Sequence, residues 1–189
     1  KKCNACSLMV PPVVVANPVV SPVMLIGQAP GDKEGPMGKP FAWTAGKTLF
    51  KWFSQIGLNE DEFRNKVYMS AVCRCFPGKK STGGDRVPNE EEIKNCSLWM
   101  DKEFAILKPR LLIPVGKLAI NLFLPDMKLN ESIGNTFTYN KGDFQADVIP
   151  LPHPSGASPW HRTEPGISLL NNALKKIKKH SAYQEIIKK

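Results

Sequence analysis

The chain carries, at residues 23–31, the stretch Val23-Met24-Leu25-Ile26-Gly27-Gln28-Ala29-Pro30-Gly31. Its first four residues form a short continuous apolar run, which is typical of a strand buried on both faces of a sheet. The glycines and the proline that follow predict a loop directly after the strand. Because a strand of this kind needs cover on both faces, the stretch indicates an α/β fold.

Apolar runs and helical patterns alternate along the rest of the chain. Further strands are predicted at residues 66–73, 111–115 and 147–151. Helices are predicted at residues 44–57, 88–107, 116–124 and 166–179, where cap residues and end charges suit helix termini. This alternation favours right-handed crossovers. We therefore expect a three-layer α/β/α sandwich around a central, mainly parallel four-stranded sheet.

Length and charge narrow the class of protein. At 189 residues with 42% hydrophobic side chains, the chain is long enough for a full core, and we expect residues 1–189 to form a single domain with segment 1–22 packed on it. The formal net charge of +9 favours an acidic polymer as partner. Four prolines interrupt the apolar stretch 8–26, so no membrane helix is predicted. We expect a monomer in the cytoplasm, associated with the nucleoid.

Five cysteines are an odd number for a disulfide framework, and a chain of this size folds without such bridges. Cys3 and Cys6 form a Cys-x-x-Cys pair, in which two thiolates reach one metal or cluster. A redox pair of the thioredoxin type would lie between a strand and a helix, and this pair lies at the terminus. The pattern favours a metal site with two further ligands downstream.

The carboxyl ends of the predicted strands locate the candidate site, because ligands of open α/β sheets bind there. Phe41 offers a flat face beside the first loop, and His153 is held between two prolines in the last loop. Each residue also has a purely structural interpretation. Phe41 could be an aromatic residue of the core, and His153 could be a loop histidine held by hydrogen bonds. Thr44-Ala45-Gly46-Lys47-Thr48 ends like a phosphate loop, but Phe41 stands where that motif needs a glycine.

Four motifs, in order along the chain, carry a resemblance to a known family. They are Gly27-Gln28-Ala29-Pro30-Gly31 with Gly38-x-Pro40-Phe41, then Cys75-Phe76-Pro77 with Asp85-Arg86-x-Pro88 and Cys96, then Lys108-Pro109-Arg110-Leu111 with Gly116, and finally His153-Pro154-Ser155. Together they resemble family 4 uracil-DNA glycosylases, which carry an iron-sulfur cluster. The segment between Cys75 and Asp85 is longer here than in that family.

The resemblance implies a DNA repair enzyme of base excision repair. It would be a monofunctional hydrolase that flips uracil, and other deaminated bases, out of DNA and cleaves the N-glycosidic bond. It implies a catalytic role for His153 and base binding by Gln28, Ala29, Phe41 and Ser70. The water would be positioned by Asp32 or Glu34, the only carboxylates near the first loop, of which Asp32 is nearer its apex. DNA contacts are expected from Ser155, Arg162, Lys79, Lys80 and Arg86. A [4Fe-4S] cluster is expected on Cys3, Cys6, Cys75 and Cys96, although Cys73 and Cys75 face the same side of a strand and could exchange roles.

The chain departs from the family at three site positions. Gln28 replaces a glutamate of family 4, Ala29 stands where family 1 has its water-activating aspartate, and Ala71 falls where an asparagine contacts uracil. A divergent branch with a broader base range is therefore expected. The missing carboxylates favour an alternative, a non-catalytic nucleic-acid-binding module organised by a four-cysteine iron-sulfur or zinc site. A hydrolase of free nucleosides is a third hypothesis, which the positive charge disfavours.

Overall fold

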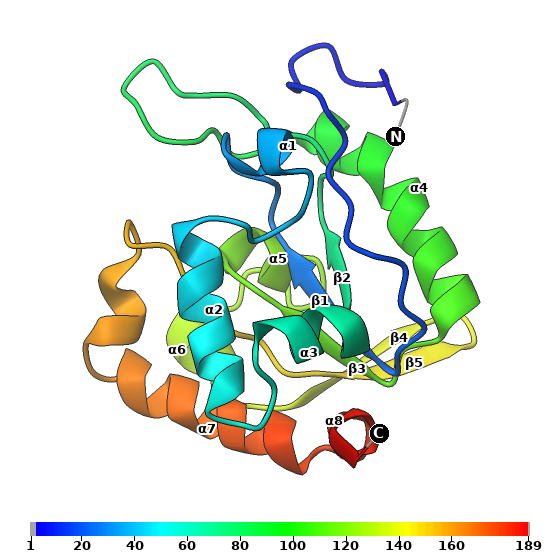
Figure 1. The fold of residues 1–189 in the computed structure, drawn as a ribbon, viewed down its shortest axis with the longest axis vertical. Helices are drawn as coiled ribbons and strands as arrows, with labels where there is room; N and C mark the ends of the chain where they lie inside the picture. Colours follow the sequence, from blue (N-terminus) through cyan, green and yellow to red (C-terminus); the bar gives the residue numbers. More distant parts are fainter. Residues whose placement is uncertain (1–2, 189) are drawn as a thin grey trace.

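The structure, a computed structural model, describes residues 3–188. Its centre is a five-stranded sheet in the order β2-β1-β3-β5-β4 (Figure 1). The strands are β1 (Val23–Gly27), β2 (Tyr68–Ala71), β3 (Leu111–Pro114), β4 (Phe137–Lys141) and β5 (Phe144–Val148). All neighbours pair in parallel except β4, which runs antiparallel to β5.

The mainly parallel α/β architecture is confirmed, but the sheet has five strands where four were predicted. The additional strand is β4, at the sheet edge, where exposed and half-buried residues follow one another. Such a strand has no continuous apolar run to mark it in the sequence. The strand expected at 147–151 is displaced for the same reason: β5 begins at the half-buried Phe144, and Leu151 makes only an isolated bridge to Val115.

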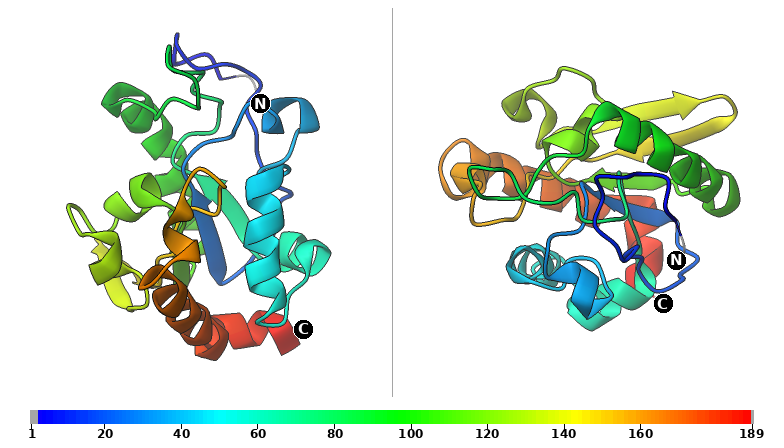
Figure 2. Two further views of the ribbon diagram at one scale, coloured as in Figure 1. Left: turned by 90° about the vertical axis from the view of Figure 1, so that its left-hand side faces the viewer. Right: turned by 90° about the horizontal axis from the view of Figure 1, so that it is seen from above.

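Helices cover both faces of the sheet (Figures 1 and 2). One face carries α2 (Thr44–Ser54), α3 (Glu60–Lys66), α7 (Gly166–Lys179) and α8 (Ser181–Lys188), and the other carries α4 (Glu90–Leu107) and α5 (Lys117–Asn121). The shorter helices are α1 (Glu34–Met37), α6 (Leu129–Ser132) and the 3₁₀ helix η1 (Pro159–Arg162). Along β1, Val23 and Leu25 join one apolar cluster while Met24 and Ile26 join the other. This alternation confirms that the strand is buried on both faces.

The helix ends follow local sequence signals. Asn89 caps α4 by accepting from the amide of Glu92, and Glu92 accepts in return from the amide of Asn89. Asn59 and Glu62 form the same reciprocal pair at the start of α3. Both pairs are capping boxes, which satisfy amides that have no partner within the helix. In the described part of the chain, no helix is long and apolar enough to cross a membrane.

Three segments gather beyond the carboxyl ends of β1 and β2 (Figure 1). They are α1 with its flanking loops, the long loop 72–89, and the N-terminal segment. The N-terminal segment is fastened to the long loop by backbone hydrogen bonds from Val10 to the Phe76 carbonyl (2.7 Å) and from Val14 to the Arg74 carbonyl (2.7 Å). Residues 1 and 2 of the predicted segment 1–22 lie outside the described residues.

Candidate active site

A cavity of about 520 Å³ opens at the carboxyl ends of β1 and β2. This is the position at which open α/β sheets bind ligands. The six predicted catalytic and base-binding residues all line it: Gln28, Ala29, Asp32, Phe41, Ser70 and His153. The structure therefore brings together side chains that are up to 125 positions apart in the sequence.

His153 lies against Gly116, the N-cap residue directly before α5. A Cβ at Gly116 would lie 2.9 Å from the Cδ2 of His153, and the φ of Gly116 is +85°, so this position requires glycine. The backbone amide of Ser155 donates to Nδ1 of His153 at 3.3 Å, and the Ser155 hydroxyl lies 2.9 Å from the same nitrogen. Because an amide can only donate, Nδ1 is an acceptor and the proton of the neutral ring is on Nε2.

The charge state of His153 follows from its surroundings. Burial lowers its pKa, and the nearby His161 lowers it further, while the negative charge of Asp85 acts in the opposite direction. The ring is therefore neutral near pH 7. A neutral imidazole with its proton on Nε2 is a hydrogen-bond donor that brings no positive charge of its own to the cavity.

Phe41 forms another wall in a constrained conformation. Its φ is +52°, in the left-handed region that a phenylalanine rarely adopts. The ring lies 3.1 Å from where a Cβ of Gly27 would stand, and a Cβ at Gly46 would lie 1.8 Å from the Phe41 carbonyl oxygen. Both glycines are thus required for the ring to lie over the end of β1.

Three carboxylates line the cavity, and they differ in their surroundings. Asp32 and Asp85 share the ammonium group of Lys79, at 3.3 Å and 2.6 Å respectively. Glu34 is buried, and burial raises its pKa to about 7, although amides of Phe41, Gly31 and Ala42 donate to it. Asp85, which belongs to the motif Asp85-Arg86-x-Pro88, lies close enough to His153 for its charge to raise the pKa of that ring.

A polar network underlies the cavity on the β2 side. The Ser70 hydroxyl donates to Glu103 at 2.7 Å and accepts from Arg74 at 3.2 Å. Arg74 also pairs with Glu103 at 2.7 Å, and the Tyr68 hydroxyl donates to Glu103 at 2.8 Å. Arg74 is buried, so its charge is compensated within the fold. Sequence reasoning missed Arg74 and Glu103, because only the packing of α4 against β2 brings them together.

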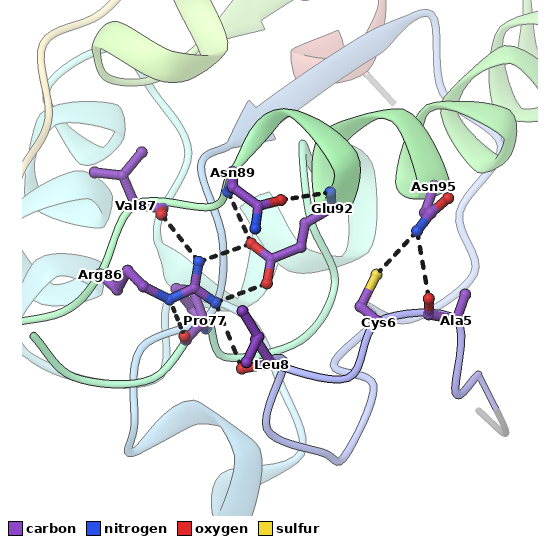
Figure 3. A network of polar contacts seen from close by, with 9 residues as sticks. All are labelled: Ala5, Cys6, Leu8, Pro77, Arg86, Val87, Asn89, Glu92 and Asn95. Carbon is purple, nitrogen blue, oxygen red and sulfur yellow. Dashed lines mark hydrogen bonds and ion pairs between the residues drawn. The ribbon is translucent and has the colours of Figure 1, made fainter.

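The four cations predicted for DNA binding divide into two groups. Lys79 is paired with Asp32 and Asp85, and Arg86 is held by Glu92 through hydrogen bonds of 2.7 Å and 2.8 Å (Figure 3). Arg86 also donates to the carbonyls of Pro77 and Leu8, so it joins the long loop to the N-terminal segment. Lys80 and Arg162 are exposed, and among residues 3–188 neither forms an ion pair.

The predicted cluster ligands share one region of the molecule. Burial raises the pKa of the Cys75 thiol, and the thiols of Cys96, Cys3 and Cys6 raise it further, so these three thiols lie within electrostatic range of Cys75. The side chain of Asn95 bridges the Ala5 carbonyl and the Cys6 sulfur (Figure 3). Within the described residues, no group of three or more His, Cys, Asp or Glu side chains is arranged to hold a metal ion.

The fifth cysteine has a distinct contact. The buried Cys73 thiol donates a hydrogen bond to Cys96, which lowers the pKa of Cys96 and raises that of Cys73. The chemistry of the donor set suits a thiolate-bound cluster, since soft thiolate ligands select iron-sulfur clusters and zinc. Cys73 and Cys75 both lie within electrostatic range of Cys96.

These features define an α/β protein with a cavity at the carboxyl ends of β1 and β2 that Phe41 and His153 both line. The chain belongs to the uracil DNA glycosylase superfamily, which it matches over residues 14–178. The expected family is thereby confirmed.

Three relatives show the range of similarity. The chain is 30% identical over 141 residues to the type-4 uracil-DNA glycosylase of Saccharolobus solfataricus, covering 71% of this chain and 61% of that protein. It is 28% identical over 160 residues to the type-4 enzyme of Thermotoga maritima, covering 82% and 77%. It is also 24% identical over 133 residues to a DNA polymerase of Bacillus phage SP01, covering 70% of this chain and 13% of the polymerase. The match thus spans only about three fifths of the Saccharolobus protein.

Proposed function

We propose that the protein is a monofunctional DNA glycosylase that excises uracil and other deaminated bases from DNA. The observation that carries this proposal is the convergence of the Phe41 ring and the His153 donor on one cavity. Stacking on an aromatic ring accepts any planar base, and a donor at the base edge selects carbonyl oxygens. The similarities to named uracil-DNA glycosylases and to part of a DNA polymerase both support DNA as the substrate.

His153 supplies the largest catalytic contribution in this proposal. When the N-glycosidic bond breaks, its electron pair moves onto the base, and a carbonyl oxygen of the base gains negative charge. The Nε2 proton of His153 donates to that oxygen, while the Ser155 amide holds the ring in the required tautomer. The neutral state of His153 suits this role, because the ring stabilises the anion as a donor and keeps its proton.

The other base contacts come from the first loop and from β2. Phe41 stacks on the flipped base, the backbone amides near Gln28 and Ala29 donate to its carbonyls, and Ser70 contributes its hydroxyl. We assign Asp32 to position the attacking water. The water oxygen bonds to the sugar carbon as the base departs with the electron pair of the N-glycosidic bond, and the proton that the water loses passes to Asp32 and from there to the base anion. Asp85 shares the same lysine and is the natural comparison in any mutational test.

DNA binding depends on cations that form no ion pair among residues 3–188. Lys80 and Arg162 are exposed and suit phosphate contacts directly, with Ser155 beside the cavity as a neutral donor. Lys79 and Arg86 would first hold the long loop in place, through Asp32 and Asp85 and through Glu92. Each phosphate contact should make affinity fall with added salt.

We assign the [4Fe-4S] cluster to Cys3, Cys6, Cys75 and Cys96, because the other three thiols lie within electrostatic range of Cys75. A cluster at this place would join the N-terminal segment, the long loop and α4, and so fix the wall of the cavity that these segments support. Its chemistry is that of a structural cross-link, and the proposed hydrolysis uses only side chains, backbone amides and water.

The test uses purified protein and oligonucleotides that carry uracil, hypoxanthine, xanthine or thymine opposite each normal base. We expect alkali-labile sites at uracil, and a loss of at least about 100-fold in the single-turnover rate for His153→Ala with DNA affinity retained. His180→Gln is the matched control, because His180 pairs with Asp147 away from the cavity. No cleavage of any oligonucleotide by the wild type would contradict the proposal.

One observation favours a second candidate, a nucleic-acid-binding module without catalysis. Neither Gln28 nor Ala29 provides the carboxylate that the resembling families have in this loop. A wild-type protein that binds these oligonucleotides in a salt-dependent manner and cleaves none of them would establish this alternative.

A further inference from the structure

We propose that Arg64 and Glu34 act as a clamp that positions Phe41 for stacking on the flipped base, one holding its carbonyl and the other its amide. This inference rests on the proposed function, because it assigns positioning residues to the same site. Arg64 does not belong to the predicted catalytic or base-binding set, and Glu34 belongs to it only as an alternative to Asp32 for positioning the water.

Arg64 reaches the Phe41 segment from α3 and is not among the residues that line the cavity. Its Nη1 donates to the Pro40 carbonyl at 3.0 Å and its Nη2 donates to the Phe41 carbonyl at 3.0 Å. The guanidinium carbon also lies 4.5 Å from the centre of the Phe50 ring, and the side chain is 13% exposed. Two parallel donors from one planar group fix both position and direction, which a single ammonium group does not do.

Glu34 holds the same segment from α1. Its carboxylate is buried, and the amides of Phe41, Gly31 and Ala42 lie close enough to lower its pKa against the effect of burial. The charge of Arg64 stabilises the ionised form of Glu34, so the two ends of the clamp reinforce each other. A buried carboxylate that is satisfied by amides on two loops fixes the distance between those loops.

The backbone conformation of Phe41 explains why contacts that hold this residue are needed. A φ of +52° is strained for a phenylalanine, and such a conformation persists only where the surroundings enforce it. Here both polar groups of the Phe41 backbone are held by charged side chains. Without these contacts the residue would relax toward a negative φ, and the ring would leave its place over Gly27.

The experiment combines a double-mutant cycle with amide exchange on the full chain. Single-turnover cleavage of uracil DNA is measured for wild type, Arg64→Lys, Glu34→Gln and Phe41→Ala, and for each clamp variant combined with Phe41→Ala. We expect a loss of about 10-fold for Arg64→Lys in the wild-type background and less than about twofold in the Phe41→Ala background. Glu60→Gln is the control, since it removes only the outer partner of Arg64.

Amide exchange gives a second result that needs no activity. Amides of residues 38–46 should exchange faster in Arg64→Lys and in Glu34→Gln, with exchange in α3 and α7 unchanged. Equal rate losses in both backgrounds, or unchanged exchange at residues 38–46 in both variants, would overturn the clamp. A wild type that cleaves no substrate would instead overturn the proposed function, so the two failures are distinct.

Discussion

Glu34→Gln tests the electrostatics of the buried carboxyl group through protein stability. Burial raises the pKa of Glu34 from 4.5 to about 7, and the amide donors and Arg64 oppose that rise. In the unfolded chain the group titrates near its ordinary value. Between pH 4.5 and pH 7 the folded state therefore binds more protons than the unfolded state, and the free energy of unfolding falls as pH rises.

The magnitude follows from the size of the shift. A change from 4.5 to about 7 corresponds to about 3 kcal/mol of unfolding free energy, fully present below pH 4.5 and lost once the pH has passed about 7. Glu34 is only 9% exposed, so solvent screening removes little of this energy. Glutamine does not titrate, and the variant lacks this component of the pH dependence.

The assay is urea unfolding of both proteins at several pH values between 4 and 8. Other titrating groups, including His153 and His161, are common to both proteins and cancel in the difference. We expect the stability of the wild type relative to Glu34→Gln to decrease by about 3 kcal/mol across this range. A difference that is constant to within about 0.5 kcal/mol would show that Glu34 remains solvated and would refute the reasoning.

Three further predictions concern the pocket, the cysteines and the long loop. Ala71→Asn should raise the ratio of uracil to hypoxanthine cleavage rates by about 10-fold, because a side-chain amide at this position discriminates between base edges. An unchanged ratio would show that another group distinguishes the two bases. Cys75→Ser should lower iron and sulfide content after anaerobic purification while Cys73→Ser retains it, and the reverse result would exchange their roles. Arg86→Met should lower the free energy of unfolding by about 2 kcal/mol at pH 7 and by less at pH 4. The reason is that Arg86 lowers the pKa of the buried Glu92, so their pairing is lost on acidification; equal losses at both pH values would contradict this.

The sequence alone determined the architecture wherever one local signal sufficed. The apolar run at residues 23–26 marks a strand buried on both faces, and Asn89 with Glu92 marks the start of a helix. Both signals involve only a few neighbouring residues, so they can be recognised in the sequence without knowledge of the fold. The motifs around Phe41 and His153 also indicated the family from the sequence alone, because they occur along this chain in the same order as in that family.

Only the tertiary structure decided which groups face one another. The pairing of Arg86 with Glu92 and the placement of Lys79 between Asp32 and Asp85 both depend on how the long loop folds. The edge strand β4 is likewise defined by its partner β5. The contacts of Phe41 with Arg64 and Glu34 join side chains and backbone across separate elements. Such contacts leave no periodic pattern in the sequence, because their energy arises only when the elements have packed.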